Sequence, residues 1–415
     1  MLKMNNKLLV IGTEHYNTLW LVRSLGMAGL KPFVIIHSDH IKSFVSRSIY
    51  CNGYIIIREK ENIIRFLLEQ TGNEKKIIFT SSDELAELLD QNYNILSSKY
   101  FIQNCNYQQG SLSYWMDKNN MVVKAADCGL TTPISLSLST YRNRDISMVK
   151  YPCIVKPELS AKASKDYFRL CNNVQELNQA IQEVKSKCAR ILVQEYIKPK
   201  YEYLIYGVST DTEICIPGGL RKIHTCSSLN NLGMMSYSCL SNEIPKQIGS
   251  LDKIKDFIKA IGYKGLFSVE FIITDDKAYF LEINLRNDGT CYITTQAGIN
   301  MPAIWAYSCM GKDSSKLSRS FVRKDTYGMN EVNYFKYTFK LKYFIRCIKE
   351  ILKTKAFSLI KINDMKPVAY KILISSLYIP ISNYIHKFLR GGVRCSNSIS
   401  YNQQHIMLLG RRCAA

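Results

Sequence analysis

The 415-residue sequence lacks several patterns that would assign it to a class at once. No apolar run approaches the roughly 20 residues of a membrane-spanning helix. The first apolar stretch, Leu8 to Gly12, is too short for the core of a signal peptide. The 14 cysteines form no CxxC pair and no regular framework. Scattered cysteines without an export signal are typical of free thiols in a reducing compartment, so we expect a cytoplasmic protein.

The sequence also has neither a zinc motif nor the dinucleotide fingerprint GxGxxG. His37 and His40 lie close together, but the residues between them complete no zinc pattern, so loop histidines are the better interpretation. A polar loop rather than a second glycine follows Gly12, so NAD binding is not expected. This loop still lies beyond a strand end, where open sheets bind ligands. A solvated loop and a substrate-binding role for Glu14 and His15 both remain open.

Acidic residues are scarce relative to basic ones. The chain has 34 Asp and Glu against 55 Lys and Arg, which gives a formal net charge of +21. Residues 331–415 alone hold 15 basic and three acidic residues. Such a surplus predicts an anionic partner, which could be a nucleotide, a phospholipid surface, a nucleic acid or an acidic glycan precursor. No RNA- or DNA-binding motif occurs, so no nucleic acid partner is expected.

Strand-like and helix-like segments alternate through the first hundred residues, which predicts an open α/β sheet. The continuous apolar run Leu8 to Gly12 is typical of a buried parallel strand. Ser82 suits the N-cap of a helix that begins at Asp83. The same patterns predict further strands at 32–36, 54–57 and 76–80 and helices at 19–30 and 61–70.

The pattern changes in the middle of the chain. A predicted helix from Trp115 to Cys128 stops at Gly129, and Pro133 follows soon after, which is a normal C-terminal signal. Short strands then alternate with helices, so we expect an α+β region with a largely antiparallel sheet. The predicted strands cover 153–156, 190–194, 202–206, 268–272 and 278–283, and the predicted helices cover 174–184 and 251–261.

The last part of the chain predicts a basic amphipathic helix. Its apolar positions have helical spacing, at Leu341, Phe344, Ile345, Ile348, Ile351 and Leu352. Basic residues occupy much of the remaining surface, at Lys340, Lys342, Arg346, Lys349 and Lys353. Docking on an anionic membrane surface and packing on the protein body with a solvated basic face both fit this pattern. A second apolar segment at 372–381 favours packing.

Two carboxylates, an amide and a guanidinium are expected on one face of two neighbouring strands. A period of two places Glu282, Asn284 and Arg286 on the same side of one strand. A short turn before this strand makes a hairpin, which brings Glu270 beside that face. Hard oxygen ligands suit Mg²⁺, and an arginine beside the ion can clamp a phosphoryl group. The alternative interpretation is a surface strand of alternating polarity with a salt bridge.

Other candidate residues lie at strand ends. Lys156 ends an apolar strand, where its amine either reaches water at the edge of a core or points at phosphates. The small polar segment 160–166 fits a flap over phosphates, although it contains no glycine. Residues 194–197 fit a hinge that meets an adenine edge. Arg221 and Lys222 follow two glycines and either hold a substrate carboxylate or lie in a solvated turn.

Five segments in this order resemble the motifs of ATP-grasp enzymes. The family includes the carbamoyl-phosphate synthase large chain, biotin carboxylases and D-aspartate ligases. Each motif is weak alone, but five in the right order are specific. The resemblance covers about residues 1 to 312 and rests on Met116–Lys118, Tyr151–Pro157, Val193–Ile197, Gly265–Phe271 and Leu281–Arg286.

The resemblance implies three parts. Residues 1–112 would form a Rossmann-like α/β domain, the pre-ATP-grasp domain. Residues 113–312 would form an α+β ATP-grasp domain, with a small lid at about 113–196. Residues 313–415 would form a basic, mainly helical C-terminal extension.

The resemblance also implies which residues bind the nucleotide. Lys118 and Lys156 match lysines that contact ATP phosphates, and Lys156 is one of two candidate catalytic residues. Glu195 and Ile197 match the hinge that holds adenine and ribose. Glu202 matches a position near the ribose.

The metal and phosphoryl positions follow in the same way. Glu270, Glu282 and Asn284 match the family's Mg²⁺ ligands. Arg286, the second candidate catalytic residue, matches the arginine that holds phosphate and acyl phosphate. The chain departs from the family at Leu285, where a proline is usual, and this change touches the acceptor side more than the metal.

The implied reaction joins a carboxylate to an amine with ATP and Mg²⁺ or Mn²⁺ as cofactors. The carboxylate attacks the γ-phosphorus, and the amine then displaces phosphate from the acyl phosphate. The layout is most similar to D-aspartate ligases and amino-acid ligases of cell-envelope synthesis, which implies an anionic lipid- or nucleotide-linked acceptor at the inner face of the membrane. The alternative is a non-catalytic nucleotide-binding or membrane-surface protein with a degenerate ATP-grasp fold.

Overall fold

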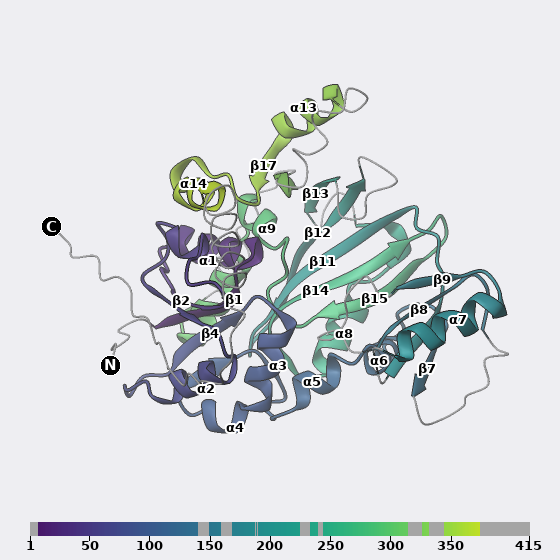
Figure 1. Ribbon diagram of the computed structural model, residues 1–415, viewed down its shortest axis with the longest axis horizontal. Coiled ribbons are helices and arrows are strands. Elements are labelled where there is room, and N and C mark those ends of the chain that lie inside the picture. The colour runs from purple at the N-terminus through teal and green to yellow at the C-terminus, as the bar shows by residue number, and fades with distance from the viewer. Residues whose placement is uncertain are drawn as a thin grey trace, which may run out of the picture.

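A computed structural model describes residues 7–139, 149–158, 168–186, 188, 190–224, 233–239, 244–313, 326–331 and 344–373. Three sheets organise these residues (Figure 1). A parallel sheet lies at one end of the molecule, a small antiparallel sheet lies at the other, and a large sheet lies between them.

The first sheet is parallel throughout, with the strand order β3-β2-β1-β4-β5. Its strands are β1 (Leu8–Thr13), β2 (Phe33–His37), β3 (Tyr54–Ile57), β4 (Lys76–Thr80) and β5 (Tyr100–Ile102). Its helices are α1 (Tyr16–Met27), η1 (Val45–Arg47), α2 (Glu61–Leu68), α3 (Asp83–Gln91) and α4 (Tyr93–Leu96). The order reverses between β1 and β4, and ligands bind beyond the carboxyl ends of strands at such a point.

Apolar strands explain why this sheet forms. The side chains of Leu9 and Ile11 are fully buried on one face and that of Val10 on the other, because helices cover both faces. The strands and helices expected here are therefore confirmed, with ends that differ by a few residues. The predicted cap at Ser82 is also confirmed, because its side chain accepts a hydrogen bond from the backbone N–H of Leu85.

The small sheet has the order β7-β10-β8-β9 and carries one helix on its face. Asn173 caps this helix, and its apolar side faces the sheet. The strands are β7 (Ser135–Ser139), β8 (Cys153–Pro157), β9 (Arg169–Cys171) and β10 (Arg190–Glu195), and the helix is α7 (Val174–Lys185). Two helices lead into it, α5 (Ser111–Trp115) and α6 (Lys118–Asp127). They replace the single predicted helix because Asp117 starts a new helix as its N-cap.

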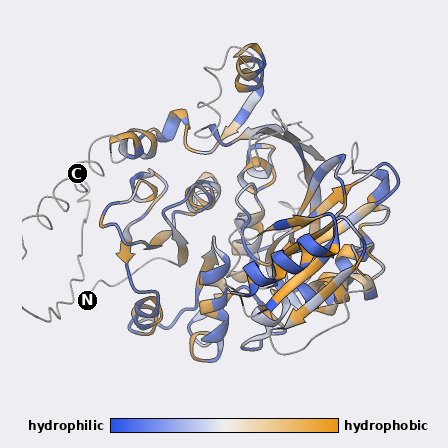
Figure 2. Cartoon of the chain, turned by 45° about the vertical axis from the view of Figure 1, so that its right-hand side comes forward, coloured by the Kyte–Doolittle hydropathy of each residue, from blue (hydrophilic) through white to orange (hydrophobic). Residues whose placement is uncertain are grey.

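The large sheet runs β15-β14-β11-β12-β13-β16-β17, and β6 (Asn104–Cys105) also pairs with β14. Its strands are β11 (Tyr201–Ser209), β12 (Ile214–His224), β13 (Gly233–Cys239), β14 (Tyr263–Ile273), β15 (Ala278–Asn284), β16 (Thr326–Met329) and β17 (Thr354–Phe357). Its helices are η4 (Lys246–Ile248), α8 (Asp252–Ala260), α9 (Tyr292–Gln296) and α10 (Met301–Cys309). Figure 2 shows apolar stretches along the strands at the right, with more hydrophilic helices beside them.

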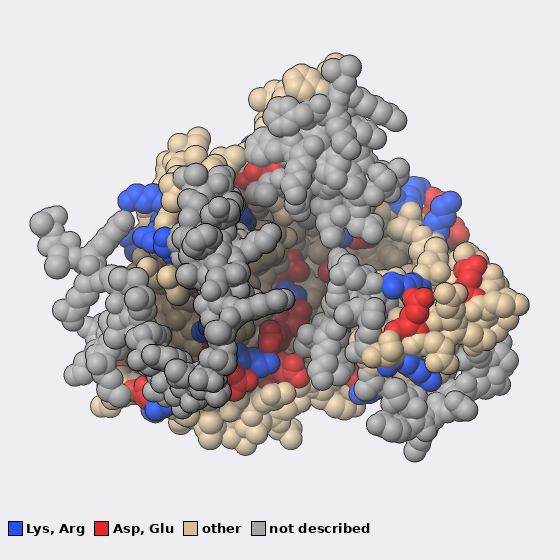
Figure 3. Space-filling model, in the orientation of Figure 1, with Lys and Arg blue, Asp and Glu red and all other residues tan. Residues whose placement is uncertain are grey.

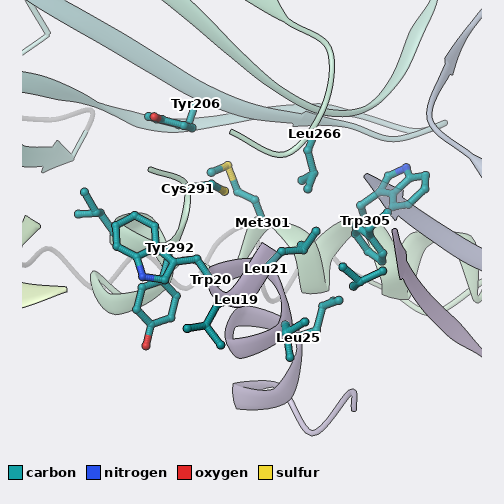
Figure 4. Close-up of a cluster of buried hydrophobic side chains, with 14 of the residues drawn as sticks. Leu19, Trp20, Leu21, Leu25, Tyr206, Leu266, Cys291, Tyr292, Met301 and Trp305 are labelled. Carbon is teal, nitrogen blue, oxygen red and sulfur yellow. The ribbon is translucent and has the colours of Figure 1, made fainter. Parts of the chain in front are cut away.

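One core joins the parallel sheet to the large sheet (Figure 4). α1 packs with α9 and α10 between the two sheets. The ring of Trp20 lies 5.3 Å from that of Tyr292, and the ring of Phe79 lies 4.8 Å from that of Trp305. The two parts are therefore held together by apolar packing, which fixes the loops at the ends of β1 and β4 against the large sheet.

The described residues after 313 include two strands that extend the large sheet. β16 pairs with β13, and β17 pairs with β16, so both extend the large sheet. The described remainder comprises α13 (Phe344–Lys353), η5 (Ile362–Asp364) and α14 (Lys366–Leu373). The two strands at Thr326–Met329 and Thr354–Phe357 were not expected within the predicted, mainly helical segment. Of the second predicted apolar segment, 372–381, residues 374–381 lie outside the described residues.

A buried ion pair fixes this segment to α1. The Nε atom of Arg23 lies 2.9 Å from an Oδ atom of Asp364, and neither side chain is exposed. Asp364 also accepts hydrogen bonds from Ser48 and Ile49. Glu331 is buried and accepts hydrogen bonds from the backbone of residues 358–360. No helix among the described residues is both long enough and apolar enough to cross a bilayer.

Candidate functional site

The hairpin of β14 and β15 brings two carboxylates together. Thr274 N–H donates to the carbonyl of Lys277, 2.9 Å away, which confirms the predicted turn. Glu270 and Glu282 are directly opposite in the antiparallel register. Cross-strand neighbours of this kind are close enough to repel when both are charged.

The two carboxyl groups have opposite pKa shifts. Burial, followed by repulsion from Glu282, raises the pKa of Glu270 to about 7. Burial also disfavours the charge of Glu282, but Lys118 and Lys156 outweigh this effect and lower its pKa. The pair therefore holds one carboxylate that is readily ionised and one that would gain from a nearby cation.

Asn284 lies in the same cluster. Its Nδ2 atom donates to Ser268 Oγ at 3.1 Å and to Glu270 Oε1 at 3.3 Å. Asp288 completes the group, 3.5 Å from the same nitrogen, and accepts hydrogen bonds from Tyr206 and Thr290. We did not assign a role to Asp288 from the sequence, although it continues the period of two through 282, 284 and 286.

The donor set fits Mg²⁺ bound together with phosphates. Within the described part of the chain, no three His, Cys, Asp or Glu side chains are placed to hold a metal by themselves. Mg²⁺ is usually bound through one or two carboxylates plus substrate phosphates and water rather than in an all-protein cage. The carboxylates of Glu270 and Glu282 match that mode of binding, whereas Asn284 directs its amide nitrogen at Glu270 and its amide oxygen at Arg286.

Arg286 connects the hairpin to the parallel sheet. Its Nε and Nη2 atoms donate to the two carboxylate oxygens of Asp83 at 2.7 and 2.8 Å. Its Nη2 atom also lies 3.2 Å from Asn284 Oδ1. Burial opposes the charge of Arg286, but Asp83 raises its pKa above the ordinary value. Asp83 is the first residue of α3, after β4, so Arg286 lies beside the point where the strand order reverses.

A network of charged residues positions Lys118 beside this cluster; its carboxylates are buried and Arg190 is half-exposed. The Nζ atom of Lys118 lies 3.4 Å from Glu282 Oε2. Asp117 caps α6, and its carboxylate lies 2.9 Å from Arg190. Arg190 also donates twice to the fully buried carboxylate of Glu158. Lys118 N–H in turn donates to the Glu158 carbonyl at 3.3 Å, so three charged residues fix its backbone.

Lys156 lies on β8 and is almost completely buried. Its Nζ atom donates to Gln194 Oε1 at 2.7 Å. Burial, followed by repulsion from Lys118, lowers the pKa of Lys156 to about 8, while Glu282 and Glu270 act in the opposite direction. The interpretation of Lys156 as a solvated edge residue is therefore wrong, and its ammonium group faces the same carboxylates as Lys118. Gln194 was predicted from the sequence as part of the hinge, and its contact with Lys156 was not expected.

The predicted hinge lies at the end of β10. The backbone N–H of Glu195 donates to the Ile134 carbonyl at 2.8 Å, and the Glu195 carboxylate accepts from Ile134 N–H at 3.3 Å. Ile197 is buried. These contacts hold the hinge residues in place, and their role in binding adenine remains a prediction. The predicted flap, residues 160–166, lies outside the described residues.

Glu202, Arg221 and Lys222 belong to one pair of strands. Glu202 on β11 forms an ion pair with Lys222 on β12. Burial opposes the charge of Lys222, but Glu202 and Glu270 outweigh burial and raise its pKa. Arg221 points to the other face, because strand residues alternate, and lies 4.1 Å from the ring of Tyr201. The interpretation of these residues as a solvated turn is wrong, and only Lys222 faces the carboxylates.

The loop after β1 and the first turn of α1, which carries Asn17, lie against the same site. Asn17 and Asn287 bond to each other, with Nδ2 of Asn287 2.6 Å from Oδ1 of Asn17. Glu14 Oε1 accepts from Phe44 N–H at 2.6 Å, which orders this loop. Figure 3 shows acidic and basic side chains together in the hollow between the parallel sheet and the large sheet. The site is therefore a cleft that several distant segments line.

Comparisons with known proteins agree with this geometry. A family model described as "ATP-grasp in the biosynthetic pathway with Ter operon" matches residues 236–331. The formate-dependent phosphoribosylglycinamide formyltransferase of Wolinella succinogenes is 23% identical over 152 residues, which cover 35% of this chain and 37% of that protein. The match thus spans little more than a third of the relative's length.

Two solved structures share the fold over most of the chain. An L-amino acid ligase from Bacillus licheniformis superposes with a TM-score of 0.58 at 16% identity, covering 76% of this chain and 77% of its own. The biotin carboxylase domain of the Hydrogenobacter thermophilus 2-oxoglutarate carboxylase, solved with MgADP and bicarbonate, gives 0.60 at 16% identity, with 77% and 73% covered. Residues 236–331 thus match an ATP-grasp family model, and the chain shares its fold with these ligase and carboxylase structures.

Proposed function

We propose that the protein is an ATP-dependent, ADP-forming ligase that joins a carboxylate to an amine. The observation that carries the proposal is the cluster of Lys118, Lys156 and Arg286 around the facing carboxylates of Glu270 and Glu282. Three cations and two carboxylates in one cleft suit a metal-bound polyphosphate. The names of the relatives support a ligase reaction, and their resemblance to this chain is strongest in fold.

Each residue has a role in this proposal. Glu270, Glu282 and Asn284 hold Mg²⁺, which when bound neutralises phosphate charge and orients the γ-phosphoryl group. Lys118 and Lys156 contact the phosphates of ATP, and Glu195, Ile197 and Glu202 lie along its adenine and ribose. This arrangement contributes mainly positioning and charge stabilisation, as phosphoryl transfer requires.

Arg286 and Lys156 are the residues that act during formation of the acyl phosphate and its reaction with the amine. The substrate carboxylate attacks the γ-phosphorus in line, ADP leaves, and the guanidinium stabilises the charge on the acyl phosphate. The amine then adds to the acyl carbon, inorganic phosphate departs, and the nitrogen loses a proton. Lys222, which faces Glu202 and Glu270, is the better placed of the two predicted carboxylate-binding residues.

The classes of acid and amine are proposed from a structural neighbour and from the charge of the chain. The structural similarity to an L-amino acid ligase supports an amino acid as one substrate. An anionic, lipid- or nucleotide-linked cell-envelope acceptor is a prediction that rests on the net charge and on the C-terminal basic segment.

A screen for ADP release tests the proposal. The full chain is incubated with Mg·ATP and each amino acid, alone and in pairs, and ADP is measured. Glu282→Gln should lower any activity found by on the order of a hundredfold or more, because it removes a metal-binding charge. Asp275→Asn, an exposed residue in the turn of the same hairpin, is the matched control and should retain activity.

The outcomes separate the alternatives. Amino-acid-dependent ADP release that Glu282→Gln abolishes supports the ligase. Tight Mg·ATP binding by calorimetry without turnover on any acid would favour a non-catalytic nucleotide-binding protein. An absence of nucleotide binding would contradict both, and activity that Glu282→Gln leaves unchanged would contradict the metal assignment.

A further inference from the structure

Part of the apolar side of α13 is exposed to solvent. Phe344, Ile345, Ile348 and Leu352 are 47, 70, 38 and 80% exposed, although they are large and apolar. At 100° per residue they occupy one continuous side of the helix. Cys347 is buried on the adjoining side, where α13 packs against the body. Contiguous exposed apolar side chains usually mark a binding surface.

Basic residues flank this stripe. Lys349 and Lys353 are exposed and follow the apolar residues around the helix. Glu350, the single acidic residue of α13, is buried and accepts a hydrogen bond from Arg346 at 3.1 Å. The exposed surface of α13 is therefore apolar on one side and positively charged on the next, without an exposed acidic group.

The rest of the described C-terminal segment also exposes apolar residues and no acidic ones. Residues 344–373 contain seven Lys and Arg and two acidic residues, Glu350 and Asp364. Both acids are buried and paired, Asp364 with Arg23. More apolar side chains are exposed between the start of η5 and the end of α14, namely Ile362, Met365, Ile372 and Leu373.

The segment is firmly attached along one edge of the molecule. Figures 1 and 2 both place α13, β17 and α14 along the same edge, away from the small sheet. β17 pairs with β16, and the buried Arg23–Asp364 pair ties η5 to α1. The exposed residues therefore form a fixed surface. We call the exposed apolar residues named above, with Lys349 and Lys353, the C-terminal patch.

We propose that the C-terminal patch docks on an anionic phospholipid surface. The apolar stripe of α13 lies in the boundary between headgroups and acyl chains, and Lys349 and Lys353 extend to the lipid phosphates. A nucleic acid would be attracted by the charge but would not use Ile345 or Leu352. A second copy of the chain would offer the same positive surface, so repulsion opposes a symmetric contact between two patches.

Vesicle sedimentation with the full chain tests this inference. We expect binding to vesicles of phosphatidylcholine mixed with phosphatidylserine and little binding to phosphatidylcholine alone. Ile345→Glu/Leu352→Glu should reduce the partition coefficient more than tenfold. Ile95→Glu, at an exposed apolar residue of α4, is the matched control and should have no effect.

Charge variants complete the design. Lys349→Gln/Lys353→Gln should reduce partitioning about fivefold for each lysine removed, and added salt should do the same to the wild type. Lys255→Gln/Lys259→Gln on α8 is the matched control. Since the four substituted residues of α13, Ile345, Lys349, Leu352 and Lys353, are all exposed, unchanged melting temperature and nucleotide affinity are expected and verify folding.

Several results would overturn the inference. These are no binding to anionic vesicles, binding that the Ile345/Leu352 variant leaves intact, or binding that a DNA oligonucleotide competes away without any dependence on the apolar residues. A change from dimer to monomer in the apolar variant, without vesicle binding by the wild type, would instead assign the patch to contact between copies. Because none of these readouts uses catalysis, their failure is distinct from failure of the proposed ligase reaction.

Discussion

Glu270 and Lys156 show how one site perturbs two groups of opposite charge. The pKa of Glu270 is raised to about 7, first by burial and then by Glu282. The pKa of Lys156 is lowered to about 8, first by burial and then by Lys118. A divalent cation beside Glu270 and phosphates beside Lys156 would each supply the missing opposite charge. Perturbed groups that converge in a cleft are typical of functional sites.

Mg·ATP affinity should therefore be greatest between about pH 7 and pH 8. Below pH 7, protonation of Glu270 removes a metal ligand, and above pH 8, loss of the proton from Lys156 removes a cation from the phosphates. On either side, affinity should fall about tenfold per pH unit if one proton is involved. Calorimetric titrations from pH 6 to pH 9 measure this, with Lys156→Met expected to flatten the alkaline limb. A pH-independent affinity would contradict these assignments.

Glu270→Gln should stabilise the metal-free protein while it abolishes activity. The folded-state pKa of about 7 exceeds the ordinary value of 4.5, so the folded protein retains a proton that the unfolded chain releases. Stability is therefore lost as the pH rises through this window. At pH 8 the variant should gain about 1 to 2 kcal/mol in the free energy of unfolding, and the gain should shrink towards pH 5. Urea titrations at both pH values, with Asp275→Asn as control, test the sign.

Some site residues could be predicted from the sequence and others could not, and the physical reason differs between them. Glu270, Glu282 and Asn284 were found because strand periodicity and a four-residue turn fix their relative positions. Asp288 could have been found by continuing that period. The contact between Asp83 and Arg286 could not, because these residues are 203 positions apart and depend on how two sheets pack.

At the scale of elements, the start of α6 depends on two buried carboxylates and the half-exposed Arg190 that joins them. Arg190 forms ion pairs with both Asp117 and Glu158, and Lys118 is the next residue after Asp117 in the chain. Arg190→Ala should leave the Glu158 carboxylate buried without its cation and with only the Ser137 hydroxyl beside it, at a cost of about 2 to 4 kcal/mol in the free energy of unfolding. The KM for ATP should rise as well, because the backbone of Lys118 loses its support.

Denaturant titration and steady-state kinetics measure both effects. Arg169→Ala, which breaks an exposed ion pair with Glu183 in the same small sheet, is the matched control and should cost less than about 1 kcal/mol. Equal effects of the two variants on stability and on KM would contradict a positioning role for Arg190.

β12 shows why some elements escaped the sequence analysis. Gly218 and Gly219 suggested a turn, since glycine is a strong signal for one. Both glycines lie within the strand, and a Cβ atom at Gly219 would lie 2.4 Å from the ring of Tyr203. Glycine is thus needed for the close approach of an aromatic ring on β11. β1, β2 and β4 were predictable because their apolar runs are continuous.

At the scale of the whole molecule, the C-terminal segment connects the parallel sheet to the large sheet. Arg23→Met should cost about 3 to 5 kcal/mol, because it leaves Asp364 buried without its cation. The double variant Arg23→Met/Asp364→Leu should recover much of this loss, since it buries no charge. Chemical denaturation measures both.

An exposed pair provides the comparison. Lys60→Met removes the partner of Glu84 at the surface and should change stability by less than about 1 kcal/mol. A similarly small effect of Arg23→Met would show that the segment after residue 343 is not part of the cooperative fold. Because Arg23 and Asp364 are 341 residues apart, no local sequence pattern could have predicted this contact.

The central claim is that the β14–β15 hairpin holds a divalent ion against a nucleotide. Diffraction from crystals soaked with Mn²⁺ and a non-hydrolysable ATP analogue tests it most directly, with data collected at the manganese absorption edge. The account predicts an anomalous peak between the carboxylates of Glu270 and Glu282, beside the phosphates of the analogue, that disappears in Glu282→Gln. A nucleotide bound without a peak there, or a peak coordinated by other residues, would contradict it.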